Sequence, residues 1–261
     1  MAHFFFSNHG RLIELVALCG VLWALESIIP LYRYRAGRLR HALPNVGLTA
    51  LLILTNLVLS FGSASLVAYA GERRLGLLFL HPLPPAATLV LGVAALDLLA
   101  YFGHVLLHKT AVGWRFHRVH HSDAWVDVTT AFRQHPGETV WRMAWQLAGT
   151  LVLGLPLWAV LVYLVLSVSN AELEHANVRV NARVDRWIRI AFVTPHMHKV
   201  HHSRDRRETD SNYSNIFSVW DRLFGSYTAR VDFSALRYGL DGLEGERAET
   251  LRGLLGLPFQ D

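Results

Sequence analysis

Long apolar runs, separated by short polar segments, set the pattern of this chain. Pro30 follows the first run and Pro44 precedes the second, while the turn sequence HPLPP precedes the third. Each run has about the 20 residues that a helix needs to cross a bilayer, and none shows the polar face of a surface helix. The three runs, 12–29, 46–69 and 86–107, therefore predict membrane-spanning helices.

A fourth run, 140–167, is too long for one ordinary span and is interrupted by GLP at 154–156. Splitting 139–172 near Gly154 gives two arms of about 17 residues, or about 25 Å each, just short of the roughly 30 Å hydrocarbon core. A single span would separate His175 from His104 and His117. If these three histidines share a site, the run forms a hairpin, either crossing or re-entrant.

Composition supports a membrane protein. The chain of 261 residues is 52% hydrophobic and 17% charged, against roughly 25% charged residues in soluble domains. We therefore expect an all-α integral membrane protein with about four transmembrane helices or hairpin arms and a cytoplasmic histidine-rich helical cap. Three regions are expected: anchor helices in 1–83, a catalytic membrane domain in 84–230 and a tail in 231–261.

Charge predicts orientation rather than nucleic-acid binding. The net charge is +5, but the arginines flank apolar runs, as topology signals and membrane-surface contacts do. Residues 32–41 carry four arginines and no acid, which places them in the cytoplasm, and the third span then returns to that face. The N-terminus lacks the features of a cleaved signal peptide. A multi-pass protein with its active site at the cytoplasmic face is expected.

One further segment, NARVDRWIRIAFVTP at 181–195, alternates arginines with apolar residues. It predicts an amphipathic helix on the cytoplasmic leaflet, with an ordinary surface helix as the alternative.

Histidines recur at helical spacing in three groups: His104 and His108; His117, His120 and His121; His198, His201 and His202. Residues three and four apart share one helix face. Thr194 and Pro195 form a good helix start before the last group, and Gly113 is expected to break the chain before the second. The single cysteine, Cys19, excludes a thiolate site. A metal site with imidazole ligands is predicted, and His3, His9, His41 and His81, which lack the pattern, are expected to bind nothing.

Asp97 and Tyr101 share a helical face with the first histidine pair. An acid inside a spanning run is costly and therefore a functional candidate. Asp97 lies too far along the helix to ligate beside both histidines. It is expected either to orient another ligand's ring or to make a structural hydrogen bond between helices.

The ordered groups, with DSNYSNIFSVWDRLFGSY at 210–227, resemble the fatty acid hydroxylase and sterol desaturase superfamily from Asp97 to Tyr227. The resemblance implies two Fe ions in a non-haem di-iron site, O2 as co-substrate, and hydroxylation or desaturation of a lipid carbon. It also implies a separate electron carrier or reductase, cytochrome b5-like or ferredoxin-like. His175, in ELEHANVRV, is similar to an additional family histidine and becomes the ninth ligand. Supporting positions around the site are assigned to Asp97, Tyr101, His135, His196, Asn212, Tyr213 and Asn215.

Two alternatives remain from the residues themselves. A dizinc membrane hydrolase would use metal-bound water and usually a carboxylate, for which Glu172 and Glu174 are the near candidates. A non-catalytic metal-binding or transport protein would place polar residues through the bilayer, where only Glu26, Asp97 and Arg142 stand out. Nine histidines exceed the four ligands of one structural zinc and fit two ions. The lipid is expected to enter from the bilayer, and no motif identifies it.

Overall fold

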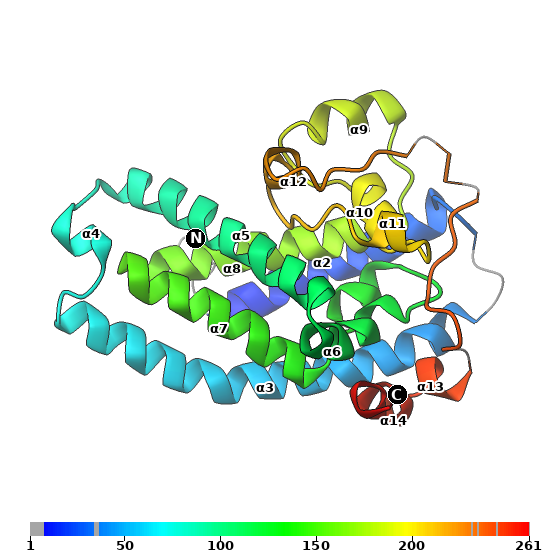
Figure 1. Ribbon diagram of the computed structural model, residues 1–261, viewed down its shortest axis with the longest axis horizontal. Coiled ribbons are helices and arrows are strands. Elements are labelled where there is room, and N and C mark those ends of the chain that lie inside the picture. The colour runs from blue at the N-terminus through cyan, green and yellow to red at the C-terminus, as the bar shows by residue number, and fades with distance from the viewer. Residues whose placement is uncertain (1–7, 34–36, 231, 234, 244, 261) are drawn as a thin grey trace.

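The computed structural model describes residues 8–33, 37–230, 232, 233, 235–243 and 245–260. The regular secondary structure of these residues is helical apart from one bridge between Pro30 and Val178. His3 lies outside the described residues, as does the side chain of His9. Long helices run roughly along the longest axis (Figure 1): α2 (Asn8–Ile28), α3 (Arg38–Glu72), α5 (Pro85–Lys109), α7 (Pro136–Leu153) and α8 (Leu157–His175).

Most short helices gather toward one end of this bundle, whereas α4 (Leu77–Leu80) lies at the other (Figure 1). They are α6 (Ala111–His121), η1 (Val128–Phe132), α9 (Ala182–Ile188), α10 (Pro195–His201), α11 (Arg206–Thr209), α12 (Val219–Leu223), α13 (Glu246–Glu249), α14 (Leu251–Gly256) and η2 (Leu257–Phe259). The predicted all-helical membrane architecture with a histidine-rich helical cap is thereby confirmed.

Three helical stretches among the described residues are long and apolar enough to cross a membrane: Arg38–Leu80, Pro85–Lys109 and Leu157–His175. The other hairpin arm, α7, is 18 residues long and carries Glu138 and Arg142 near its start. α5 packs against α6, α7 and α8 and so forms the centre of the bundle. A cluster of buried apolar side chains joins it to α8, namely Val93, Leu96, Leu155, Val160, Tyr163 and Ile216.

The predicted hairpin is present, and Gly154 makes its turn. Gly154 has a left-handed φ of 70° and its N–H donates to the carbonyls of Thr150 and Leu151. The turn also packs closely on another loop, because a Cβ added to Gly76 would lie 2.3 Å from the Gly154 nitrogen. The turn returns the chain along α8, so that His175 ends beside the histidines of α5 and α6.

Two predicted helix starts are wrong. α3 begins at Arg38 rather than after Pro44. Pro44 lies inside the helix, which lacks one backbone hydrogen bond there because proline has no N–H to donate. The Arg38 guanidinium pairs with Glu26 and lies 3.6 Å from the ring centroid of Trp23, contacts that hold the earlier start in place. Gly113 does not break the chain. It lies in the first turn of α6, where its N–H donates to Thr110 Oγ1.

The C-terminal region packs on the helical cap. Leu254 and Leu257 are fully buried with Leu48 of α3 and Val119 of α6. The buried Arg133 guanidinium donates to the carbonyl of Ala248 at 2.6 Å. The division of the chain at 83/84 and 230/231 stays a prediction.

Candidate metal centre

Nine buried histidines form two groups, and they come from α5, α6, α8 and α10 and from His202 directly after α10. One group holds His104, His108, His117, His121 and His201, and the other holds His120, His175, His198 and His202. Within each group the candidate ligand atoms all lie within 4.8 Å of one another. These are the nine predicted ligands, and each group is able to hold a metal ion.

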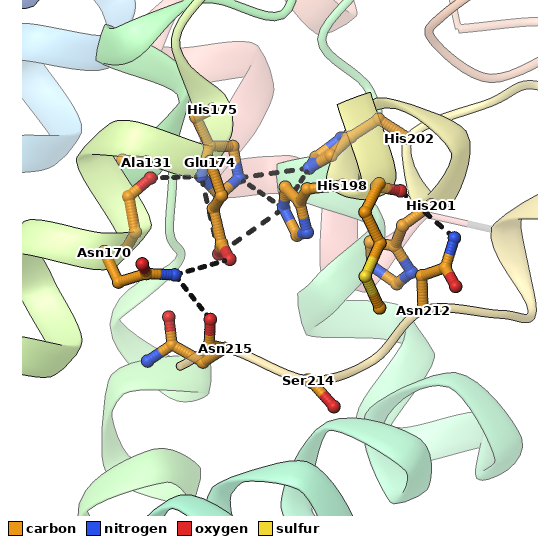
Figure 2. A network of polar contacts seen from close by, with 12 residues as sticks. Ala131, Asn170, Glu174, His175, His198, His201, His202, Asn212, Ser214 and Asn215 are labelled. Atoms are coloured by element: carbon orange, nitrogen blue, oxygen red, sulfur yellow. Dashed lines mark hydrogen bonds and ion pairs between the residues drawn. The ribbon is translucent and has the colours of Figure 1, made fainter. Parts of the chain in front are cut away.

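The four-histidine group converges through Nε2 atoms. His175 Nε2 lies 3.1 Å from that of His120, 3.0 Å from that of His198 and 3.1 Å from that of His202. A histidine nitrogen binds a metal ion at about 2.1 Å. Two nitrogens that bind the same ion are therefore about 3 Å apart when the angle between the two bonds is roughly 90°. The spacing therefore fits one shared ion. Figure 2 shows His198 and His202 pointing at His175.

The five-histidine group leaves several ring nitrogens buried without a protein partner. His104 Nε2 lies 3.0 Å from His117 Nε2. The Nε2 atoms of His108, His121 and His201 are buried and have no hydrogen-bond partner among the described residues. An unsatisfied buried polar atom costs about 1–3 kcal/mol, and three such nitrogens beside the His104–His117 pair are difficult to explain unless an ion binds the group.

Backbone carbonyls fix the orientation of three rings. The Nδ1 atoms of His104, His201 and His175 each lie 2.7 Å from a carbonyl oxygen, that of Tyr213, Ser211 and Ala171 respectively. A carbonyl can only accept, so Nδ1 carries the proton and the Nε2 lone pair is directed at the group.

Two carboxylates lie beside further rings of the five-histidine group. Glu138 Oε1 lies 3.0 Å from His117 Nδ1, with both side chains fully buried. Asp210 Oδ1 lies 3.4 Å from His108 Nδ1. Neither acid was identified from the sequence, because each lies on a separate element from its histidine.

Burial keeps the histidines outside the spanning helices in the neutral form that metals bind. It is the main cause that lowers the pKa of His117, His120, His121, His198 and His202 well below the usual value, and the neighbouring histidines lower it further. Burial likewise lowers the pKa of His201 to about 4.

Lys199 lies between these histidines in α10 and ties that helix to α8. Its fully buried Nζ donates to the carbonyl of Val126 at 3.0 Å and to that of His175. Burial lowers the pKa of Lys199 to about 8.

Asp97 forms hydrogen bonds with the 210–227 segment, and a role in orienting a ligand ring stays a prediction. It accepts hydrogen bonds from the backbone N–H groups of Ile216 and Phe217 at 3.1 Å and 3.0 Å and from Trp220 Nε1 at 2.9 Å, and none of these donors is a histidine. Tyr101 bonds through its hydroxyl to Ser226 Oγ at 2.8 Å. α5 thereby anchors the 210–227 segment, whose carbonyls orient His104 and His201.

Asn212, Tyr213 and Asn215 lie in that segment. Asn212 has a φ of 54°, and its Nδ2 donates to the carbonyls of Met197 and Thr228. The Tyr213 ring packs against His104, His108 and His201. Asn215 Nδ2 donates to Ser167 Oγ at 2.6 Å, which joins the segment to α8.

His135 and His196 lie outside both groups. His135 Nδ1 accepts from the N–H of Gly137 and caps α7. His196 Nδ1 lies 3.6 Å from Asp185 Oδ1, beside α9. A supporting role at the metal centre stays a prediction for both.

Glu174 is the carboxylate that faces the four-histidine group. Its Oε1 lies 3.7 Å from His198 Nε2, and its Oε2 accepts from Asn170 Nδ2 at 3.3 Å (Figure 2). Glu172, two residues earlier, is buried, and neither carboxyl oxygen has a hydrogen-bond partner among the described residues.

Comparison with known proteins finds a matching family model and several similar proteins. The family model described as fatty acid hydroxylase matches residues 89–226. The ornithine lipid hydroxylase OlsE of Rhizobium tropici is 31% identical over 159 residues, covering 61% of this chain and 47% of that protein. The alkylglycerol monooxygenase of Homo sapiens is 28% identical over 229 residues, covering 88% of this chain and 47% of that protein. The chain thus spans about half the length of these relatives, and no solved structure matches it.

Proposed function

This chain belongs to the fatty acid hydroxylase family, and on that premise we propose that it is a membrane-bound di-iron oxygenase that hydroxylates a lipid C–H bond. The observation that carries the proposal is the convergence of nine buried histidines into two groups at one end of a bundle with three candidate spans. Two iron ions held there would supply the oxidising power for the reaction.

The protein's own contribution is to hold neutral imidazoles in place and keep water out. All nine histidines are buried, and the carbonyls of Ala171, Ser211 and Tyr213 hold three of the rings with Nε2 free to bind. The ligand type suits iron but also zinc, copper and nickel, so the choice of iron rests on the family rather than on the donor atoms.

The substrate we propose is a lipid that reaches the site from the bilayer. Both relatives carry names of enzymes that oxidise lipids with a polar head, ornithine lipid and alkylglycerol. The site lies at the end of α5 and α8, two candidate spans, where a lipid chain can approach without leaving the membrane. Activity on a soluble substrate and none on lipids would contradict this route.

The reaction needs two electrons that the lipid does not supply. Hydroxylation converts R–H, O2, two electrons and two protons into R–OH and water, and the lipid supplies only two of the four electrons that O2 accepts. We propose a reductase that delivers the other two through a cytochrome b5-like or ferredoxin-like carrier at the cytoplasmic face.

A dizinc hydrolase is the second candidate, and Glu174 favours it. Its carboxylate lies beside His198, where it could accept a proton from a metal-bound water. Metal identity separates the two proposals.

The deciding test is the metal content of protein purified without added metal, compared with a His120→Ala/His201→Ala double variant. The double variant removes one histidine from each group. We expect about two irons per wild-type chain and a loss of most of that iron in the variant, because each ion loses a ligand. Elemental analysis gives the result directly.

His81→Ala is the matched control, because His81 is exposed and belongs to neither group. It should retain the wild-type iron. Two zincs and no iron, even after growth with added iron, would contradict the oxygenase and favour the hydrolase.

A further inference from the structure

Two segments far apart in the sequence form one exposed apolar surface, here named the α9–α12 surface. It combines α9 and the residues just after it with α12 and Phe224. Trp187 is 74% exposed and Leu223 is 66% exposed. The other exposed apolar side chains of this surface are Val184, Ile188, Ile190, Phe192, Val219 and Phe224.

Backbone bonds hold the two segments together. The N–H of Val193 donates to the carbonyl of Ile216 at 3.0 Å, and that of Ser218 donates to the carbonyl of Ala191 at 3.1 Å. The rings of Phe192 and Phe217 lie 5.7 Å apart. The surface is therefore a fixed unit rather than two independent helices.

The charges on this surface have one sign. Arg183, Arg186 and Arg222 are exposed, whereas the two acids of these segments, Asp185 and Asp221, are buried. Asp185 accepts from Thr194 Oγ1 at 2.6 Å, and Asp221 accepts from the N–H groups of the 210–227 segment, so both are used internally. Only positive charge remains for an outside partner.

The surface continues directly from a spanning helix. The Phe224 ring stacks on Tyr101 of α5 with ring centroids 5.4 Å apart and lies 5.0 Å from Phe102. Tyr101 precedes the ligand histidine His104 by one turn. Figure 1 shows α12 beside α5 near the histidine end, with α9 farther out on the same side.

We propose that the α9–α12 surface is embedded in the headgroup layer of an anionic membrane. Its arginines contact lipid phosphates, while Trp187, Ile190 and Leu223 enter the acyl boundary, as in amphipathic segments that lie in a bilayer interface. Phe224 joins the surface to the candidate span α5, which favours lipid over a water-soluble acidic protein because the surface then lies at the boundary of the bilayer. The proposal rests on the chain spanning a membrane and not on its oxygenase activity.

Because Cys19 is the only cysteine, Cys19→Ser gives a background for single nitroxide labels. The full chain is reconstituted in vesicles of phosphatidylcholine and phosphatidylglycerol with a label at Trp187→Cys or Leu223→Cys. Collision rates with O2, which partitions into lipid, and with a nickel chelate, which stays in water, are then measured. We expect a severalfold higher ratio of O2 to nickel collisions at both sites than at the control, Glu246→Cys on exposed α13.

A second measurement tests the contribution of the arginines. Phosphatidylglycerol should increase the ratio of O2 to nickel collisions at Leu223→Cys. An Arg186→Gln/Arg222→Gln variant should lose most of that increase. Ratios at 187 and 223 equal to that at 246 would overturn the proposal. The proposal would also be overturned if both sites were protected from nickel collisions only after an acidic carrier protein is added. That result would identify a protein-docking surface.

Discussion

Glu138 and His117 form a buried pair at the edge of the five-histidine group. Both side chains are fully buried, and Arg142 Nε donates to Glu138 Oε1 at 2.7 Å. A carboxylate beside Nδ1 favours the proton on that nitrogen, and the opposite nitrogen then becomes a better donor to a metal. We therefore expect Glu138 to strengthen metal binding by the five-histidine group without being a ligand itself.

Replacing Glu138 by Gln keeps the size of the side chain and removes its charge. We expect the affinity of the five-histidine group to fall by about 10- to 100-fold, while the four-histidine group, which Glu138 does not contact, keeps its affinity. Anaerobic titration with Fe(II) or Co(II), followed by the metal absorption bands, resolves the two sites. Glu246→Gln is the control, and an equal loss at both groups would show that Glu138 only stabilises the fold.

Residue spacing revealed eight of the nine clustered histidines, and the family resemblance added His175. Glu138 could not be identified in that way, because it lies on α7 and only the fold brings it to His117. The role of the Ser211 and Tyr213 carbonyls could not be predicted from the sequence for a different reason. Every residue has a carbonyl, so the sequence does not mark the ones that orient a ring.

At the scale of elements, α6 depends on a close approach at Gly113. A Cβ there would lie 2.7 Å from the Cα of Leu107 and 2.8 Å from the carbonyl oxygen of Leu106. These are backbone atoms that cannot move aside easily. The histidines of α6 reach both groups only because α6 begins this close to the end of α5.

Gly113→Ala is expected to cost about 1–3 kcal/mol by overpacking and to lower metal content by displacing α6. Gly62→Ala in α3 is the matched control, since nothing lies within 4 Å of its added Cβ. Thermal unfolding in detergent, with elemental analysis of the same samples, measures both effects. The expectation fails if the two variants unfold at the same temperature.

The hairpin was predictable because Gly154 and Pro156 are local signals. The start of α3 was not, because the pairing of Arg38 with Glu26 and Trp23 comes from another helix and outweighs the local effect of Pro44. Helix ends set by tertiary contacts are the part of the fold that the sequence pattern leaves open.

At the scale of the whole molecule, the arginines of 32–41 predict that the histidine end faces the cytoplasm. In the Cys19→Ser background, His81→Cys marks the loop at the other end and Glu246→Cys marks the histidine end. Both positions are exposed. A membrane-impermeant maleimide should label 81 in intact spheroplasts and label 246 only after permeabilisation. The reverse pattern would place the site on the opposite side.

The four-histidine group draws on both sides of the hairpin in the sequence: His120 precedes it, His175 ends it, and His198 and His202 follow it. During synthesis these side chains become available in that order, and the last appears only after both hairpin arms have left the ribosome. A metal ion that needs all four histidines as ligands can bind only after the hairpin has been inserted into the membrane. Metal acquisition would then be the closing event of biogenesis, and a chain whose hairpin stalls at the translocon would accumulate without metal.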